Sequence, residues 1–286
     1  MGIFKAAAVQ MRSGTDIGRN VVDFERLVRA AAGEGARYVQ TPEMTGALVR
    51  GKEAREAFTS EDRDPLVACA ARLAAELSIV LHVGSTAILR ADGKIANRAF
   101  LFGPDGARIA TYDKIHMFDV DLDNGESWRE SAVYEAGGAG VVAALPFARL
   151  GMAVCYDLRF PQLFRAEALA GAEMLSVPAA FTRQTGEAHW HVLLRARAIE
   201  NGAWVVAAAQ GGLHEDGRET FGHSLIIDPW GRIVAEADGD EPGVIVAEID
   251  TQASAAARAK IPNLRNAREF TVETPAASAA LRGAAA

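Results

Sequence analysis

A cysteine at the end of an apolar run is the first residue in this sequence that could do covalent chemistry. Cys155 lies in GMAVCYDLRFPQLF, residues 151–164, where a strand pattern ends shortly before a helix pattern that begins near Pro161. In α/β proteins, loops after the carboxyl ends of strands commonly carry reactive groups. Free cysteine has a pKa of about 8.5, so a nucleophilic role requires a neighbouring base or cation. The position predicts a partly exposed thiol near helix N–H groups, and the alternative is a buried side chain that only fills space.

Two charged residues in unusual places could supply that base and that cation. Glu43 follows Pro42 at the end of the apolar segment RYVQTPEM, and Lys114 lies in TYDKIHMFDVD. A carboxylate can remove a thiol proton, and an ammonium group can stabilise an oxyanion. Each residue alone is typical of a solvated surface position. The chemical argument therefore depends on Glu43, Lys114 and Cys155 together.

Short apolar runs alternate with longer amphipathic segments along the chain. This alternation, with additional hairpins, predicts a mixed α/β fold with buried sheets. We expect helices at residues 21–36, 64–78, 161–172 and 185–203. We expect strands at residues 3–11, 37–44, 79–89, 95–103, 172–180, 204–212 and 243–250, two strands within 141–157 and a hairpin over 223–238.

The chain contains no interior linker and no short repeat. We therefore predict a single domain over residues 1–270. The segment 271–286 is an Ala-rich C-terminal tail without a clear apolar face. The tail is either disordered or helical when it docks on a partner.

The composition excludes several other classes of protein. Half of the 286 residues are hydrophobic, and the net charge of −7 comes without a long Lys/Arg run, so no nucleic-acid partner is predicted. The two cysteines, Cys69 and Cys155, fit a reducing cytoplasm, and Cys69 reads as a packing residue of a helix. No segment approaches the roughly 18 apolar residues of a membrane span, and the N-terminus is unlike a signal peptide. We expect a cytoplasmic protein with no membrane partner.

Three motifs resemble the catalytic motifs of the nitrilase superfamily, also called the carbon–nitrogen hydrolases. They are TPEMTG around Glu43, YDKIHMFDVD around Lys114 and GMAVCYDLRFPQLFR around Cys155, in the family's order. The segments 177–210 and 222–236 are similar to the family's Nit branch, and the resemblance extends to about residue 265. It implies a four-layer α-β-β-α sandwich whose protomers pair through helices. A homodimer or larger homo-oligomer is therefore expected.

The resemblance implies a Glu–Lys–Cys catalytic triad for the hydrolysis of a C–N bond. Cys155 would attack the substrate carbonyl carbon and form a thioester, with Glu43 as the general base. Lys114 would stabilise the oxyanion, with the backbone N–H of Tyr156 as a second donor. This chemistry requires neither a metal ion nor an organic cofactor.

The acidic segment DVDLDNGESWRE, residues 119–130, has two interpretations. The resemblance implies a second catalytic acid at Glu130, which would orient Lys114 and the substrate amide; the neighbouring Glu126 is the alternative, and we favour Glu130. The segment also resembles a calcium-binding loop. However, Asn124 occupies the sixth position, where the sharp turn of such a loop requires glycine. We therefore do not expect calcium binding.

His189 and His191 in AHWHVLL are the other candidate metal ligands. Residues i and i+2 of a helix do not share one face, and no Cys or Asp cluster surrounds them in the sequence. We therefore expect both histidines to lie on a helix surface or to support neighbouring side chains, with no bound metal.

The predicted substrate is a short amide that carries a carboxylate group. The Nit-type segments favour deaminated glutathione first and α-ketoglutaramate second. Arg159, four residues after Cys155, would bind the carboxylate or instead form a structural ion pair with Asp157, and Thr182 is a second pocket candidate. Nitrile hydrolysis and N-carbamoyl amino acid hydrolysis by the same triad are alternatives. A non-catalytic interaction scaffold is a more remote alternative.

Overall fold

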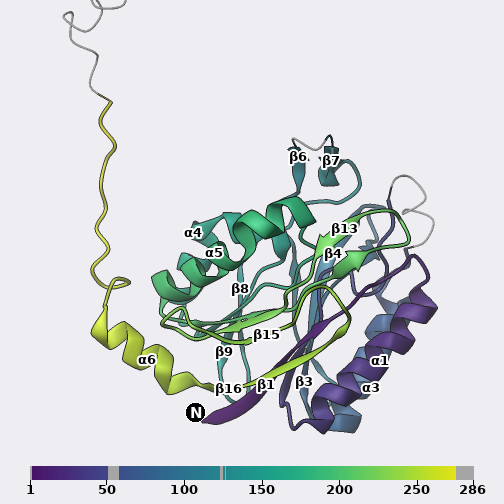
Figure 1. The fold of residues 1–286 in the computed structure, drawn as a ribbon, viewed down its shortest axis with the longest axis horizontal. Coiled ribbons are helices and arrows are strands. Elements are labelled where there is room, and N and C mark those ends of the chain that lie inside the picture. The colour runs from purple at the N-terminus through teal and green to yellow at the C-terminus, as the bar shows by residue number, and fades with distance from the viewer. Residues whose placement is uncertain (1, 51–57, 123–124, 126, 275–286) are drawn as a thin grey trace, which may run out of the picture.

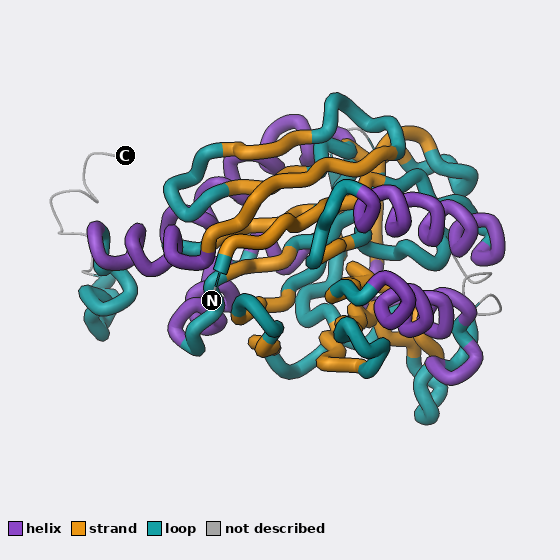
Figure 2. Tube along the Cα trace, turned by 90° about the horizontal axis from the view of Figure 1, so that it is seen from below, coloured by secondary structure: helices purple, strands orange, loops and turns teal. Residues whose placement is uncertain are grey.

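Two six-stranded β-sheets lie face to face, and α-helices cover the outer face of each sheet (Figures 1 and 2). The computed structural model describes residues 2–50, 58–122, 125 and 127–274. A helix layer, two sheets and a second helix layer make up the predicted four-layer α-β-β-α sandwich. The predicted fold class is therefore confirmed.

Each sheet combines parallel central strands with antiparallel outer strands. The first sheet contains, in spatial order, β16 (Gly243–Asp250), β1 (Ile3–Gln10), β2 (Tyr38–Gln40), β3 (Val80–Leu89), β4 (Ile95–Phe102) and β5 (Arg108–Asp113). The second contains β15 (Ile233–Glu236), β14 (Leu225–Ile227), β11 (Trp204–Ala207), β10 (Met174–Ser176), β9 (Arg149–Met152) and β8 (Val141–Ala144). Parallel strands are covered on both faces, which explains why their sequences are almost continuously apolar.

Alternate residues of β1 face two different hydrophobic cores. Ala6 and Ala8 belong to the core between the two sheets, whereas Ala7 and Val9 belong to the core under the outer helices. Successive side chains of a strand point to opposite faces, so both faces of β1 must be apolar. A slip of one residue would exchange the two sets, and the eight-residue pairing with β16 holds the register.

Two pairs of helices form the outer layers (Figure 1). Helices α1 (Ile17–Gly33) and α3 (Pro65–Leu77) cover the first sheet, and α4 (Pro161–Leu169) and α5 (Arg183–Asn201) cover the second. The Asp16 carboxylate accepts hydrogen bonds from the backbone N–H groups of Gly18 and Arg19. This N-cap explains why α1 begins at Ile17, four residues before the predicted start at 21.

Short hairpins and 3₁₀ turns connect the main strands, and several of them contribute residues to a cavity. The two small hairpins are β6 (Asp119–Asp121) with β7 (Ser127–Arg129), and β12 (Gly211–Leu213) with β13 (Glu219–Phe221). Three 3₁₀ turns are η1 (Glu61–Arg63), η2 (Glu130–Ala132) and η3 (Cys155–Arg159). Figure 1 shows β6 and β7 projecting beyond the end of the sheets.

Several predicted strands are shorter in the structure. The predicted strand 37–44 is β2 with only three residues, 172–180 is β10, and 204–212 divides into β11 and β12. The strands predicted within 141–157 are β8 and β9, so the second strand ends at Met152. The apolar pattern continues after the last ladder hydrogen bond because the loops beyond the strand ends are themselves buried. Strand β5 and helix α6 (Thr251–Lys260) were not predicted.

The C-terminal region leaves the sandwich after β16. Helix α6 and the following extended segment point away from the sheets (Figure 1). Of the predicted tail 271–286, residues 271–274 are exposed and have no helix or strand, and residues 275–286 lie outside the described residues. The domain boundary at residue 270 stays a prediction.

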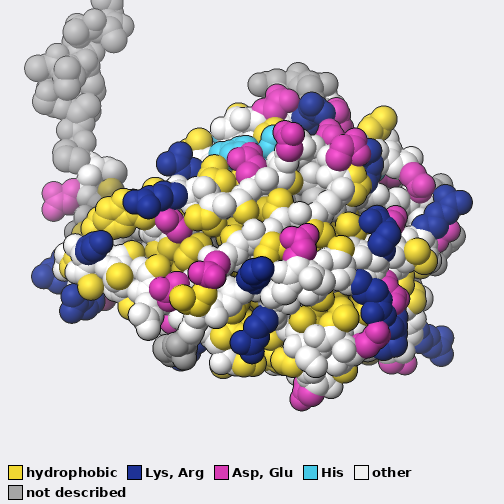
Figure 3. Space-filling view, turned by 60° about the horizontal axis from the view of Figure 1, so that its bottom comes forward, with side chains coloured by type: hydrophobic (Ala, Val, Ile, Leu, Met, Phe, Trp, Pro, Cys, Tyr) yellow, Lys and Arg dark blue, Asp and Glu magenta, His cyan; other side chains and the backbone are white. Residues whose placement is uncertain are grey.

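The surface has no strong segregation of charge on the face in Figure 3. There, Lys and Arg side chains are interspersed with Asp and Glu side chains, and apolar side chains lie between them. Within residues 2–50, 58–122, 125 and 127–274, no helix is long and apolar enough to span a bilayer.

Candidate active site

Glu43, Lys114 and Cys155 lie together in one cavity of about 670 Å³. Glu43 follows β2 and Lys114 follows β5, both in the first sheet, whereas Cys155 follows β9 in the second. The facing of the two sheets therefore brings together residues that are far apart in the sequence. Glu130, Tyr156 and Thr182 also line this cavity.

The Glu43 carboxylate is held by three hydrogen-bond donors. Its Oε1 atom accepts hydrogen bonds from Lys114 Nζ at 2.8 Å and Asn97 Nδ2 at 2.9 Å, and its Oε2 atom accepts from the backbone N–H of Ala180 at 2.9 Å. Burial alone would raise the pKa of Glu43, but the Lys114 ammonium and the hydrogen bonds lower it overall. The side chain is therefore a carboxylate that is ready to accept a proton.

Lys114 is a fully buried ammonium group between two carboxylates. Its Nζ atom lies 2.8 Å from Glu43 Oε1 and at 2.8 and 2.9 Å from the two carboxylate oxygens of Glu130. Burial opposes the charged form, but Glu130 and Glu43 outweigh it and raise the pKa of Lys114 well above its ordinary value. A permanent positive charge thus lies beside the thiol.

Glu130 is the second carboxylate that holds Lys114. Its Oε2 atom also accepts a hydrogen bond of 2.6 Å from the backbone N–H of Phe118, and its Oε1 atom accepts one of 3.2 Å from Asn97. These contacts fix the carboxylate that the sequence analysis preferred. The alternative, Glu126, lies outside the described residues.

The thiol of Cys155 is buried, which corrects the expectation of a partly exposed group. Cys155 retains 8% of its accessible surface and adopts a left-handed backbone conformation with φ of 48°. It begins the 3₁₀ turn η3, six residues before α4, so the helical N–H groups that follow it in the chain are those of η3. Burial and the hydrogen-bonded Glu43 carboxylate together raise the pKa of the thiol well above its usual range, although Lys114 opposes them. The resting group is therefore a neutral thiol that requires a base.

Asp157 anchors the turn that carries Cys155, but not through Arg159. Its fully buried carboxylate accepts hydrogen bonds from Val154 N at 2.9 Å, Tyr112 Oη at 2.7 Å and His116 N at 3.1 Å. The structural ion pair that was weighed between Asp157 and Arg159 is therefore not the arrangement observed. Asp157 instead fixes the strand end from which the cysteine projects.

Arg159 stands behind the cavity wall. Its guanidinium lies 5.2 Å from the Phe181 ring centre, and its Nη1 atom is 3.3 Å from His189 Nδ1. Arg159 is not among the described residues that line the cavity, whereas Thr182 is, with its hydroxyl 2.7 Å from that of Thr185.

The sequence analysis missed Asn97 and the arginines at the outer part of the cavity. Arg50 lies over the Trp128 ring at 4.0 Å, and Arg218 lies 5.1 Å from the same ring. Arg218 is oriented by a 2.7 Å ion pair with Asp216. Asn97 could have been noticed as a polar residue within the apolar strand pattern 95–103, but no local signal places the arginines in the cavity.

Within the described residues, one group of His and carboxylate side chains lies close enough to share an ion: His191, His223 and Glu236, none of which lines the cavity. In the segment once compared with a calcium loop, Asp119 bonds Ser131 and Asp121 bonds Arg129. The described part of this segment forms the β6–β7 hairpin.

Comparisons with known proteins find one matching family and several similar proteins. The model of the carbon-nitrogen hydrolase family matches residues 5–259. A protein named deaminated glutathione amidase from Synechocystis is 39% identical over 268 residues, which cover 92% of this chain and 97% of that protein. The human protein named omega-amidase NIT2 is 34% identical over 271 residues, which cover 94% and 96%. The crystal structure of the C. elegans NitFhit protein has a TM-score of 0.87 at 32% identity and covers 94% of this chain; this chain spans 66% of that one.

Proposed function

Because this chain belongs to the carbon–nitrogen hydrolase family, we propose that it is an amidase that hydrolyses a small, carboxylate-bearing amide through a thioester on Cys155. The observation that carries this proposal is the contact between a neutral thiol and an ionised Glu43, beside a permanent cation. A nucleophile, a base and an oxyanion partner thus face the same cavity.

In the first half of the reaction, Cys155 forms a bond to the carbonyl carbon of the amide. Glu43 accepts the thiol proton as the C–S bond forms, so no free thiolate is required. The carbonyl oxygen becomes an oxyanion, which Lys114 and the backbone N–H of Tyr156 stabilise. One such donor lowers the activation barrier by roughly 3–4 kcal/mol.

In the second half, the tetrahedral intermediate collapses and the C–N bond breaks. Glu43 returns its proton to the leaving nitrogen, and ammonia departs from the thioester. Water then attacks the thioester while Glu43 removes its proton, and Cys155 leaves with a proton. The sum of these steps is amide plus water to carboxylic acid plus ammonia, and the residues return to their resting states.

Glu130 acts as a positioning residue in this scheme. Its two oxygens hold Lys114 Nζ in place, while the Phe118 N–H fixes the carboxylate itself. Asn97 donates to both Glu43 and Glu130, so it keeps the two acids at a constant separation. The ammonium group is therefore already oriented when the oxyanion forms.

The substrate carboxylate is assigned to the arginines at the outer part of the cavity rather than to Arg159. Arg218 lines the cavity and is preoriented by Asp216, and Arg50 adds a second positive charge nearby. A volume of about 670 Å³ lies within the range for sites that enclose a whole small molecule, which favours deaminated glutathione over the smaller α-ketoglutaramate. The amidase names of the relatives agree with this order.

Ammonia release from a substrate panel tests the proposed function. The panel contains deaminated glutathione, α-ketoglutaramate, an N-carbamoyl amino acid and a simple nitrile, with Cys155→Ala as the blank. We expect the highest kcat/KM with deaminated glutathione. A preference for the nitrile or the N-carbamoyl compound would replace the proposal by one of the two alternative chemistries, and no release from any compound would favour the scaffold alternative.

Arg218→Gln should lower kcat/KM about 10- to 100-fold for a carboxylated amide, because a charge-assisted hydrogen bond contributes about 1.5–3 kcal/mol. The same variant should leave the uncharged analogue of that amide almost unaffected. Arg159→Gln is the matched control, since Arg159 lies behind the wall. If Arg159→Gln produced the selective loss and Arg218→Gln did not, the carboxylate would bind at the originally predicted arginine.

Incubation with EDTA should leave the rate of ammonia release unchanged. Every proton and bond in the scheme is handled by Glu43, Lys114 and Cys155, and the His–Glu cluster lies outside the cavity. The measurement is the steady-state rate before and after chelation and after zinc is added back. A loss that added metal restores would contradict the metal-free mechanism.

We also propose the cytoplasmic homo-oligomer that the sequence predicted. Leu169 on α4 and Val192 and Ile199 on α5 are large apolar side chains that are more than half exposed. Such residues on neighbouring helices favour a helix-mediated contact between protomers. Light scattering that showed a stable, fully active monomer would contradict this assembly.

A further inference from the structure

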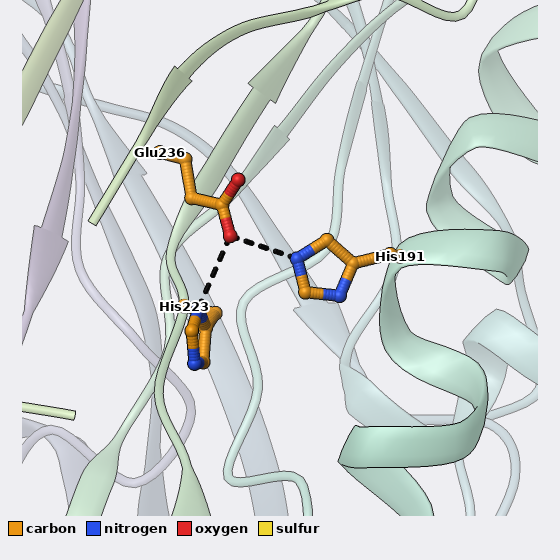
Figure 4. Close-up of side chains that lie close together, drawn as sticks. All are labelled: His191, His223 and Glu236. Carbon is orange, nitrogen blue, oxygen red and sulfur yellow. Dashed lines mark hydrogen bonds and ion pairs between the residues drawn. The ribbon is translucent and has the colours of Figure 1, made fainter. Parts of the chain in front are cut away.

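Two imidazoles and one carboxylate converge at the surface, away from the catalytic cavity. His191 projects from α5, His223 lies between β13 and β14, and Glu236 ends β15 (Figure 4). Glu236 Oε1 lies 2.8 Å from His191 Nε2 and 3.1 Å from His223 Nδ1. One nitrogen of each imidazole and a carboxylate oxygen all lie within 4.8 Å of one another.

We propose that His191, His223 and Glu236 form a binding site for a divalent transition metal, with zinc as the best-fitting ion. Zinc is commonly held by three protein ligands of this kind plus a water molecule. Bonds of about 2.0–2.1 Å in a tetrahedron place neighbouring ligand atoms about 3.3 Å apart. The two nitrogen–oxygen distances are already close to that value, and rotation of the imidazole rings would complete the set.

The backbone around this metal site is held in place before any ion binds. The fully buried Trp190, which precedes His191 on α5, donates a 2.8 Å hydrogen bond from Nε1 to the carbonyl oxygen of His223. The N–H of His223 donates to Gly239 O at 2.9 Å, and its φ is 52°. The two histidine-bearing segments are therefore tied together by their own contacts, which lowers the cost of ordering the ligands.

The rings are also supported from one side by an aromatic neighbour. The Phe221 ring stacks on His223 with ring centres 4.4 Å apart and meets His191 edge-on at 5.9 Å. It gives the metal site a partly apolar backing of the kind that strengthens charge–ligand interactions.

The three ligands remain accessible to an ion from solution. The side chains of His191, His223 and Glu236 are 31%, 28% and 34% exposed.

A metal ion at this site would connect three separate elements. It would add a direct link between α5, the segment after β13 and the end of β15, beside the hydrogen bonds of Glu236 and Trp190. Because the native state would bind the ion and the unfolded chain would lose the geometry, zinc should stabilise the fold. The role is structural, and no step of amide hydrolysis passes through it.

The test is zinc binding to full-length protein in a Cys155→Ala background, which removes the catalytic thiol as a competing ligand. Competition with a chromophoric chelator gives the affinity and the number of zinc ions bound. Thermal unfolding gives the accompanying shift, for which we expect a rise of a few degrees at saturating zinc. Cobalt, added in place of zinc, should give the visible absorption bands of a tetrahedral site without thiolate charge transfer.

The variants are chosen to keep the fold while removing one ligand each. His191→Gln and Glu236→Gln preserve size, and His223→Asn tolerates the positive φ. Each should weaken zinc binding at least about tenfold and abolish the thermal shift. His189→Gln, which changes the neighbouring histidine of α5 that contacts Arg159, is the matched control and should bind zinc like its parent.

The possible results of the zinc experiments either support the metal site or overturn it. One zinc ion per chain that depends on all three ligands and not on His189 supports the metal site. Binding that is unchanged in His191→Gln and Glu236→Gln, binding that His189→Gln weakens equally, or no measurable binding would overturn it. None of these results depends on amidase activity, so failure of the metal site and failure of the proposed function are distinguishable.

Discussion

Cys155→Ala should reduce amide turnover by about four orders of magnitude or more, to the level of the uncatalysed background. The reason is that the Cys155 thiol is the nucleophile of the proposed scheme and is hydrogen-bonded to the Glu43 carboxylate in the cavity. Ammonia release measures the loss. Mass spectrometry of acid-quenched wild-type enzyme should find the acyl group of the substrate on the peptide that contains Cys155.

The other cysteine supplies the matched control. Cys69 lies in α3, contacts Arg72 and Glu25, and is not among the residues that line the cavity. Cys69→Ala should leave kcat/KM unchanged and cost only about 1 kcal/mol of stability. Near-wild-type ammonia release in Cys155→Ala, with an unchanged circular dichroism spectrum, would overturn the covalent mechanism.

Glu43→Gln should separate catalysis from thiol reactivity. Without its general base, the variant should lose about 10²- to 10⁴-fold in kcat. The reactivity of the Cys155 thiol should change in the opposite direction to the catalytic activity. Burial and the Glu43 carboxylate raise this pKa, and Lys114 lowers it, so neutralising Glu43 should lower the pKa of the thiol. The variant should therefore be alkylated by iodoacetamide at lower pH than the wild-type protein.

The measurement is the rate of Cys155 alkylation as a function of pH, read by peptide mass spectrometry. Glu248→Gln is the control, because Glu248 is an exposed carboxylate on β16 and should alter neither activity nor alkylation. If the alkylation profile of Glu43→Gln shifted to higher pH, Glu43 would not be the anion that faces the thiol. Unchanged kcat would remove it as the general base.

Family and fold class could be predicted from the sequence because both depend on local patterns. The continuous apolar runs and the intervening amphipathic segments predict covered sheets, and the structure has them. Three motifs in a fixed order predicted the carbon–nitrogen hydrolase family, and the family model over residues 5–259 confirms that prediction. Strand ends were less predictable, since a buried loop after β2 or β9 has the same apolar composition as the strand before it.

The environment of each candidate residue was decided by the tertiary structure. The sequence predicted a partly exposed thiol from its position after a strand, but the thiol is buried in the structure, and burial raises its pKa. Arg218 lies directly before β13 and lines the cavity beside residues that are far away in the sequence, so no local pattern could place it there.

The spatial partners of His191 also depend on the tertiary structure. Along the sequence, His191 was compared with His189, two residues away, and that pair cannot share a face of α5. Its partners in the structure are His223 and Glu236, which the chain reaches only after leaving the helix and crossing the second sheet. The sequence alone determined which chemical groups were present and which local elements they would occupy. Their distances, burial and ionisation required the packing of the two sheets, because these properties depend on residues far apart in the chain.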